Sequence, residues 1–279
     1  MKKSIIKKLF IKLSRFLGYE IIDQSNFSSP TLRKQLNEDL SIINEKSIVL
    51  PLGEVNITKK VISVLIIFRT NTDIEIWDQN KKRLFELPKI EYSLRSLNSL
   101  IKSVNFSKTK YSNIKFKIII VDDKSKNENL NKIKSLIEQS GLDIVIRPLN
   151  HDRYRNIIKQ QKNDQTFSNL ASLLQSFEIG KELGKDLVYF VEDDYLHFEP
   201  MMEEMIASYE RIASQLKKDI FMCPADYPYL YMDNEKTNIL IGNKRHWRTI
   251  SRTLCTFMTT KPLLNKYWNN FYNNCLDRH

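Results

Sequence analysis

Cysteine is scarce in this chain, and the three cysteines among its 279 residues lie far apart. Cys223, Cys255 and Cys275 form no C-x-x-C pair, so neither a disulfide framework nor a zinc site is expected. An odd number of separated thiols fits a reducing compartment. We therefore expect a cytoplasmic protein.

The chain also has few glycines and no long apolar run. With only six glycines, it carries no glycine-rich phosphate loop after its first apolar segment. No run approaches the ~18–20 apolar residues needed to cross a bilayer. Lysines interrupt the apolar residues of the N-terminus, which argues against a secretory signal. Because hydrophobic residues still make up 42% of the sequence, one large domain with an appendage can bury a core.

Positive charge is concentrated at the N-terminus. The formal net charge is +11, and residues 1–19 contain six basic residues and no acidic one. Residues 2–17 follow a helical period, with apolar side chains on one arc and basic side chains opposite, and Gly18 is expected to end this helix. Such a helix either lies on an anionic membrane surface or docks on protein, and its pattern leaves both open. The remaining positive charge is spread thinly, so we expect no nucleic-acid partner.

Strand-like and helix-like segments alternate from about Val61 onward. Residues 20–60 are predicted to be a linker with one short helix near 31–44, and residues 71–90 a loop or hairpin. The predicted strands are 61–68, 115–121, 143–147, 187–191, 219–223 and 253–259. The predicted helices are 91–104, 129–139, 166–183, 200–216 and 261–271. This alternation predicts an α/β fold, with a mostly parallel sheet covered by helices on both faces.

Three consecutive carboxylates close the fourth predicted strand. The apolar run 187–191 is followed at once by Glu192, Asp193 and Asp194. Adjacent acids repel one another unless something positive lies among them. A hard divalent cation, Mg²⁺ or Mn²⁺, is the usual occupant of an all-oxygen site. The alternative is a solvated acidic loop, which the apolar residues on both sides of the acids disfavour.

A second pair of acids closes the strand predicted at 115–121. Asp122 and Asp123 follow that strand directly. Acids at the carboxyl ends of two parallel strands meet at one edge of the sheet, where such folds bind nucleotides. There they can accept hydrogen bonds from a base or a ribose. The alternative is a turn or a cap for the next helix.

These segments resemble the GT-A glycosyltransferases, close to the family 2 type. In that family one strand ends in Val-Asp-Asp-Gly-Ser, and a later strand ends in a D-x-D metal motif. Here residues 121–125 read VDDKS, with Lys124 in the glycine position, and residues 192–194 read EDD. The first strand departs from the family, because Ile-Phe-Arg-Thr at 67–70 replaces the usual Pro-Thr-Tyr-Asn-like turn.

The resemblance implies a GT-A domain at 61–279. Residues 61–200 would form the half that binds the nucleotide sugar. Residues 201–279 would form the acceptor half, which we expect to be truncated at its C-terminus.

The resemblance also implies roles for the acids. Asp123 would contact the nucleobase, and Asp193 would lie near the ribose or the sugar. Asp194 would bind Mn²⁺ or Mg²⁺, with Glu192 contributing to the same site. Asp122 and Arg69, at neighbouring strand ends, are expected to bind the same donor.

Basic and aromatic residues gather later in the chain. Arginines can hold a diphosphate through paired hydrogen bonds, which makes Arg245 and Arg248 candidates for donor binding. Trp247 is expected to stack on a sugar face, and His246 to ligate a metal or position the acceptor. The alternative is a surface loop with a half-buried tryptophan.

An inverting transfer requires a carboxylate that deprotonates the acceptor hydroxyl. Asp226 is the first candidate and Asp277 the second, with Asp233 and Glu235 behind them. His279 is a candidate third metal ligand, although a frayed terminus is the alternative for that end.

We therefore expect a metal-dependent enzyme that transfers a sugar from a nucleotide-diphosphate donor to a hydroxyl of a glycan or lipid-linked acceptor, as in polysaccharide biosynthesis. Its N-terminal helix would place it peripherally at the inner face of the cell membrane. Two alternatives remain: a nucleotidyltransferase on a similar sheet, or an inactive relative that binds membranes or nucleic acid.

Overall fold

We describe the fold from a computed structural model of the chain. The structure describes residues 2–19, 46–49, 53–73, 87–158, 164–232 and 237–276. The chain divides into two compact units, Met1–Asn56 and Ile57–His279. Each unit is described by itself below.

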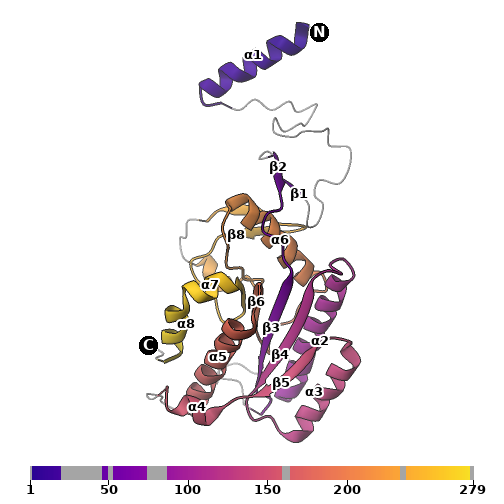
Figure 1. Cartoon of the computed structure of the whole chain (residues 1–279), viewed down its shortest axis with the longest axis vertical. Coiled ribbons are helices and arrows are strands. Elements are labelled where there is room, and N and C mark those ends of the chain that lie inside the picture. The colour runs from indigo at the N-terminus through magenta and orange to yellow at the C-terminus, as the bar shows by residue number, and fades with distance from the viewer. Residues whose placement is uncertain are drawn as a thin grey trace. The chain divides into compact units, whose positions relative to one another are not determined.

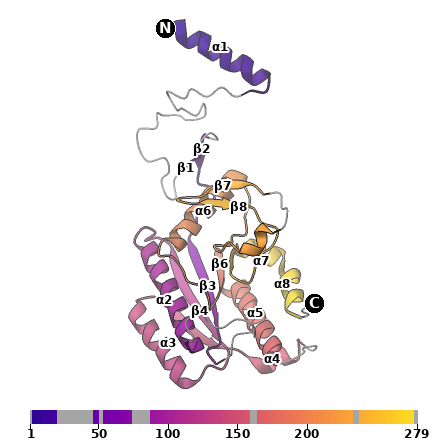
Figure 2. The same ribbon diagram turned by 180° about the vertical axis from the view of Figure 1, so that it is seen from behind.

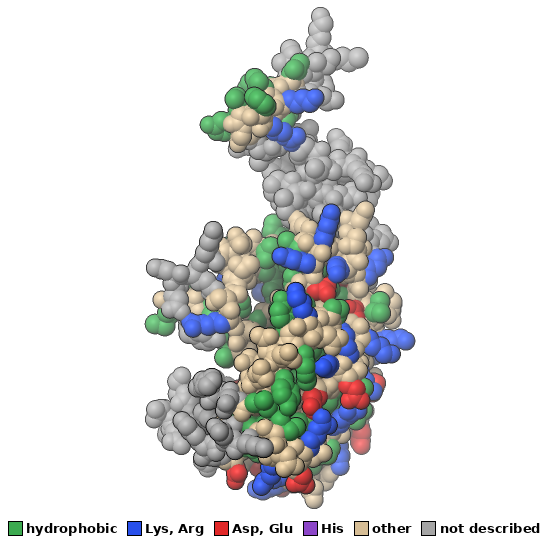
Figure 3. Space-filling view, turned by 60° about the vertical axis from the view of Figure 1, so that its left-hand side comes forward, with side chains coloured by type: hydrophobic (Ala, Val, Ile, Leu, Met, Phe, Trp, Pro, Cys, Tyr) green, Lys and Arg blue, Asp and Glu red, His purple; other side chains and the backbone are tan. Residues whose placement is uncertain are grey.

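The first unit contains the predicted N-terminal helix. Helix α1 spans Lys2–Phe16, and its large apolar side chains Leu9, Phe10 and Leu13 are exposed. Figure 3 shows the hydrophobic side chains of α1 on one side and its basic side chains on another. The helix prediction is thus confirmed. No helix within the described ranges is both long enough and apolar enough to span a membrane.

An antiparallel strand pair stands where the linker was expected to be irregular. Strands β1 (Lys46–Val49) and β2 (Gly53–Asn56) pair in this part of the chain. These strands are hard to recognise in sequence because each has only four residues. The short helix predicted near 31–44 lies outside the described residues.

The second unit is built on a five-stranded sheet in the order β5-β4-β3-β6-β9. The strands are β3 (Ser63–Thr70), β4 (Lys115–Asp122), β5 (Ile144–Pro148), β6 (Leu187–Glu192) and β9 (Phe257–Thr260). The first four are parallel to one another, and β9 pairs antiparallel with β6. The predicted mostly parallel α/β sheet is confirmed.

One predicted strand does not form. Residues 219–223 contribute only an isolated antiparallel bridge between Met222 and Met258. The segment therefore meets the edge strand β9 through one pair of residues only. The strand expected at 253–259 begins at Phe257 rather than at Thr253.

Helices cover both faces of the sheet (Figures 1 and 2). One face carries α2 (Lys89–Lys108), α3 (Asn127–Ser140) and α6 (Met201–Leu216). The other face carries α4 (His151–Arg155), α5 (Asp164–Leu183), α7 (Lys261–Lys266) and α8 (Trp268–Leu276). Alternate residues of β3 serve the two cores: Ile66 and Phe68 on one side, Leu65 and Ile67 on the other. This explains the continuous apolar runs, because strands buried on both faces need no polar alternation.

Three short elements complete the unit. They are the 3₁₀ helix η1 (Pro228–Tyr231) and the antiparallel pair β7 (Ile239–Ile241) and β8 (His246–Arg248). Helix α4 and the β7–β8 hairpin were not predicted, because each is too short to show a clear period.

The strand order fixes where a ligand crevice belongs. From β3 the chain proceeds to β4 and β5 on one side, and it then crosses to β6 on the other side. Such a reversal marks the binding edge of an open α/β sheet, at the carboxyl ends of the strands. Register brings those ends level, since Thr70 pairs with Asp122 and Arg69 pairs with Glu192.

Candidate active site

Arg69 and Glu192 form an ion pair at the strand reversal. The guanidinium of Arg69 has an exposed side-chain fraction of only 8%, and its Nη2 donates to Oε1 of Glu192 at 2.7 Å. Its Nη1 donates to Asn169 and Ser172 of α5. Burial raises the pKa of Glu192, while the charge of Arg69 opposes that rise. Arg69 therefore holds Glu192 and ties β3 to both β6 and α5.

Asp193 is held by three donors. Its Oδ1 accepts from Nζ of Lys89 at 2.6 Å. Its Oδ2 accepts from Ser93 Oγ at 2.6 Å and from Thr70 Oγ1 at 2.9 Å. Asp193 thus joins the end of β3 to the start of α2. Lys89 was not predicted as a site residue, because it lies 104 residues away in the sequence and carries no motif.

Asp194 is the acid of the three that remains open. It is exposed, and its side chain makes no hydrogen bond or ion pair with another residue in the described ranges. Desolvation by the surrounding protein raises the pKa of Asp194, Lys89 opposes this rise, and the charge of Asp193 adds to it. A carboxylate in this state is available for a cation or a substrate proton.

The three acids do not form a ready three-ligand metal centre. Among the residues that the structure describes, no group of three or more His, Cys, Asp or Glu side chains could hold a metal ion. Arg69 and Lys89 supply the positive charge that the sequence reasoning assigned to a cation alone. Of the three acids, Asp194 is therefore the one whose negative charge still favours binding of a metal ion.

Asp122 shapes the turn that follows β4. It is buried, and its Oδ2 accepts from the backbone N–H of Ser125 at 3.2 Å. Its Oδ1 is buried without a partner among the described residues, and burial raises the pKa of Asp122. Lys124 has a φ of 57°, which is the left-handed conformation that favours glycine. The position where the family has glycine thus keeps a glycine-like backbone.

Asp123 lies beside Asp122 but faces different partners. Its Oδ2 accepts from Nδ2 of Asn71 at 3.0 Å, and its Oδ1 lies 2.6 Å from Nε2 of His151. The backbone N–H of Asp123 donates to Thr70 at the end of β3. His151 was not predicted as a site residue, since it starts a five-residue helix that the sequence pattern does not reveal.

Asp226 is neutralised by an arginine from the hairpin. Nη2 of Arg248 lies 2.8 Å from Oδ1 of Asp226, and the hydroxyl of Tyr231 donates to Oδ2. The guanidinium of Arg248 also lies 4.4 Å from the centre of the Tyr231 ring. The hydrogen bond from Arg248 lowers the pKa of Asp226, which weakens this carboxylate as a base.

Trp247 and Arg245 differ in exposure. Trp247 is half-buried against the core, and its indole N–H donates to Oε1 of Glu204 at 3.1 Å. This geometry fits the alternative of a surface loop with a half-buried tryptophan better than an indole ring free to stack on a sugar. Arg245 is exposed at the hairpin tip, with its guanidinium 5.7 Å from the ring centre of Phe198. Since Phe198 follows the acids by only a few residues, the hairpin tip lies close to the segment that leaves β6.

The hydroxyls of Tyr195 and Tyr227 lie 2.7 Å apart, which joins the residue after Asp194 to the residue after Asp226. This contact places the residue that follows the EDD acids beside the residue that follows the candidate base Asp226. Asp277 and His279 lie outside the described residues, as do Asp233 and Glu235.

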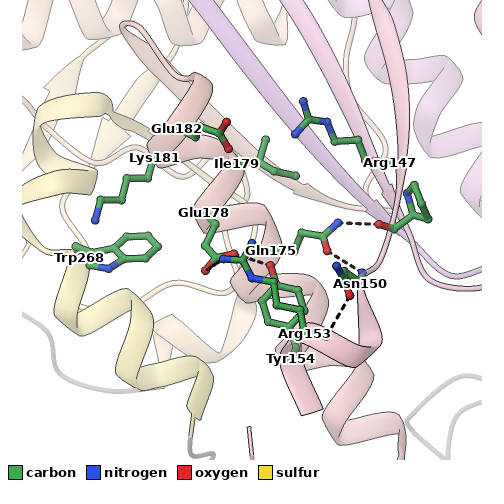
Figure 4. A pocket seen from close by; sticks show the side chains of 11 residues that line it. Arg147, Asn150, Arg153, Tyr154, Gln175, Glu178, Ile179, Lys181, Glu182 and Trp268 are labelled. Atoms are coloured by element: carbon green, nitrogen blue, oxygen red, sulfur yellow. Dashed lines mark hydrogen bonds and ion pairs between the residues drawn. The ribbon is translucent and has the colours of Figure 1, made fainter. Parts of the chain in front are cut away.

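A separate cavity of about 670 Å³ opens beside α5 (Figure 4). Figure 4 shows Trp268 from α8 facing Arg153 and Tyr154 from α4 across the side chains of α5. Gln175 and Glu178 of α5 line the cavity between them. None of the predicted site residues lines this cavity, which includes Arg147 and Pro148 from the end of β5.

Comparison with known proteins gives similarities of fold. No protein-family model matches the chain, and no curated protein matches it. The structure of S. aureus TarS 1–349 is similar with a TM-score of 0.41 at 15% identity, covering 73% of this chain and 48% of that chain. The same TarS segment in complex with UDP has a TM-score of 0.41 at 15% identity, covering 77% and 55%. The chain spans about half the length of these TarS structures.

The galactosyltransferase LgtC in complex with donor and acceptor sugar analogs has a TM-score of 0.33 at 9% identity. That match covers 77% of this chain and 66% of LgtC.

Proposed function

We propose that the chain is a glycosyltransferase that moves a sugar from a nucleotide-diphosphate donor to a hydroxyl of a glycan or a lipid-linked acceptor. One observation carries the proposal. At the reversal of strand order, the side chain of Asp194 has no partner among the described residues. Glu192 beside it is held by Arg69, and Asp193 is held by Lys89 and two hydroxyl groups. A site with two held acids and one free acid suits a substrate that itself brings negative charge and a counter-ion.

Asp194 fits Mg²⁺ or Mn²⁺, because these ions are commonly held by one or two carboxylates together with substrate phosphates. Glu192 gives one oxygen to Arg69, and its second oxygen is proposed to serve the same ion. His279 stays a predicted further ligand. When bound, the ion would offset the charge that builds on the departing diphosphate.

The protein residues have proposed tasks of their own. Asp123 is proposed to accept a hydrogen bond from the nucleobase, and Asp193 to lie near the ribose or sugar. Exposed Arg245 is proposed to contact the diphosphate. Asp226 remains the proposed base for an inverting transfer, provided that the acceptor displaces Arg248 from its carboxylate, since the ion pair otherwise keeps Asp226 a weak base.

Calorimetry with UDP and GDP, with and without Mn²⁺, tests the proposal. Asp194→Asn is expected to abolish the Mn²⁺-dependent part of nucleotide binding. Asp152→Asn is the matched control, because Asp152 is exposed on α4 and lines no part of the site. Equal behaviour of the two variants would remove the assignment of Asp194. Donor hydrolysis across a panel of nucleotide sugars would then identify the sugar.

Helix α1 supports a membrane-surface location for the acceptor. Its exposed apolar side chains and its basic side chains suit the interface of an anionic bilayer. The chain with α1 is expected to sediment with vesicles that contain phosphatidylglycerol and not with neutral ones. A Phe16→Glu variant should bind less, because Phe16 is 86% exposed and its apolar contact would be lost. Equal sedimentation of the variant and the native chain would refute this location.

A further inference from the structure

His151 contacts the acid that the proposed function assigns to the nucleobase. Nε2 of His151 lies 2.6 Å from Oδ1 of Asp123, and the exposed side-chain fractions are 12% and 6%. A contact of this length between two nearly buried groups is a strong hydrogen bond. It is also long-range, because Asp123 follows β4 whereas His151 begins α4.

The imidazole is held in place by its own surroundings. The side chain of Asn150 caps α4 by accepting from the backbone N–H of Arg153 at 3.1 Å. The backbone N–H of Asn150 donates to Gln175 of α5 at 2.9 Å, and Gln175 donates back to Pro148 at 3.0 Å (Figure 4). The ring of Phe167 lies 5.9 Å from the ring of His151. The start of α4 is therefore fixed on α5 and β5.

Asp123 is thereby gripped from two sides. His151 contacts Oδ1, and Asn71 donates to Oδ2 at 3.0 Å from the end of β3. A carboxylate offers about four acceptor positions. Two donors thus fix the plane of the carboxylate and leave acceptor capacity for an N–H or O–H group of a ligand.

We propose that His151 is a positioning residue for nucleoside recognition, and that it acts by orienting Asp123. The inference rests on the proposed function and deepens it. His151 contacts Asp123, the acid assigned to the nucleobase, so its effect is expected on the nucleoside part of the donor. The diphosphate part is assigned to Asp194 and its proposed ion, after the end of β6. Removing His151 should therefore weaken binding of a nucleotide without weakening binding of pyrophosphate.

Calorimetry in Mn²⁺ with UDP, GDP and inorganic pyrophosphate tests this separation. His151→Ala is expected to weaken the tighter of the two nucleotides about tenfold, the usual effect of losing one hydrogen bond to a charged group. His151→Gln should recover most of this loss, because its amide nitrogen can still donate to Asp123. Pyrophosphate affinity should be the same in all variants. Asp152→Ala, next along α4, should match the native chain.

The outcomes separate the two proposals. If the native chain binds neither nucleotide, the proposed function fails and the role of His151 falls with it. If the native chain binds a nucleotide and His151→Ala binds it equally well, only the role of His151 is overturned. It is also overturned if His151→Ala loses nucleotide and pyrophosphate affinity together while its melting temperature drops, since that pattern marks a purely structural contact.

Discussion

The Nζ atom of Lys89 lies 2.6 Å from Oδ1 of Asp193, which places a lysine from the first turn of α2 against the middle acid of the EDD segment. Arg69 stands in the same relation to Glu192 on the neighbouring strand. The protein therefore counters two of the three adjacent negative charges with its own cations. Among the described residues, Asp194 is the one acid of the three whose side chain has no such partner.

Replacing Lys89 with methionine should destabilise the second unit. Asp193 would keep its bonds to Ser93 and Thr70 but lose its counter-charge. Breaking a fully buried pair costs about 3–5 kcal/mol, and because Lys89 is 19% exposed we expect about 2 kcal/mol. Urea unfolding measures this. Lys102→Met, at an exposed position of the same helix, should change stability by less than about 0.5 kcal/mol. Equal losses in both variants would contradict the role of the ion pair.

Chelation should leave the fold intact. Because Glu192 and Asp193 already have protein counter-charges, the ligand-free protein needs no cation to hold its acids together. We expect EDTA to shift the melting temperature by less than about 1 °C, since that corresponds to well under 1 kcal/mol for a domain of this size. A drop of several degrees, restored by Mn²⁺, would show instead that a cation is part of the folded ground state.

Lys124→Gly should stabilise the protein. Lys124 has a φ of 57°, where a side chain costs about 1–2 kcal/mol. Glycine removes that cost but loses about 0.4–1 kcal/mol through its freer unfolded state, so a net gain of about 0.5–1 kcal/mol is expected. Calorimetric melting measures it. Lys134→Gly, within α3, should have the opposite sign, because glycine weakens a helix interior.

The β7–β8 hairpin should loosen when Glu204 changes. Glu204 is buried on α6 and accepts from the backbone N–H groups of Asn243 and Lys244 and from the indole of Trp247. In Glu204→Gln, an amide N–H would face these donors. Hydrogen exchange at Asn243 and Lys244 is expected to accelerate at least tenfold, which corresponds to about 1.4 kcal/mol. Glu199→Gln, at an exposed site, should leave both rates unchanged.

His197 should make the fold sensitive to mild acid. Burial lowers the pKa of His197 to about 4, from 6.5. Between these values the unfolded chain binds a proton that the folded chain refuses, so stability falls as the pH is lowered from 6.5 toward 4. The loss attributable to this group is about 2–3 kcal/mol. Urea unfolding of native and His197→Asn protein at pH 7 and pH 4.5 measures it, and the variant should lose less. Identical pH profiles would exclude His197 as the cause.

The sequence predicts the central sheet well because its strands carry their own signal. The apolar runs in β3, β4 and β6, which in β4 is the stretch 118–121, are buried, and burial on both faces demands uninterrupted apolar residues. Positions where polarity changes abruptly, such as Glu192, mark strand ends for the same reason. The strand prediction for 219–223 was wrong because an apolar run of that length can also lie beside the edge strand and form only one bridge to it.

The partners of the acids could not be predicted in the same way. Lys89 and Arg69 reach the EDD segment from 104 and 123 residues away, and nothing in a local pattern records such a contact. The same holds for His151, whose helix has only five residues. Sequence reasoning recognised that clustered acids need positive charge, but the topology decides whether the protein or an ion supplies it.

Helix α5 gives Asn169 and Ser172 to Arg69, and one turn further it gives Gln175 and Glu178 to α4 and the cavity. One helix, α5, thus contacts both the ion pair at the strand ends and the cavity. A ligand that bound in the cavity and shifted α5 along its axis would disturb the hydrogen bonds from Arg69 to Asn169 and Ser172. Binding in the cavity would then change the position of Arg69 without contacting it.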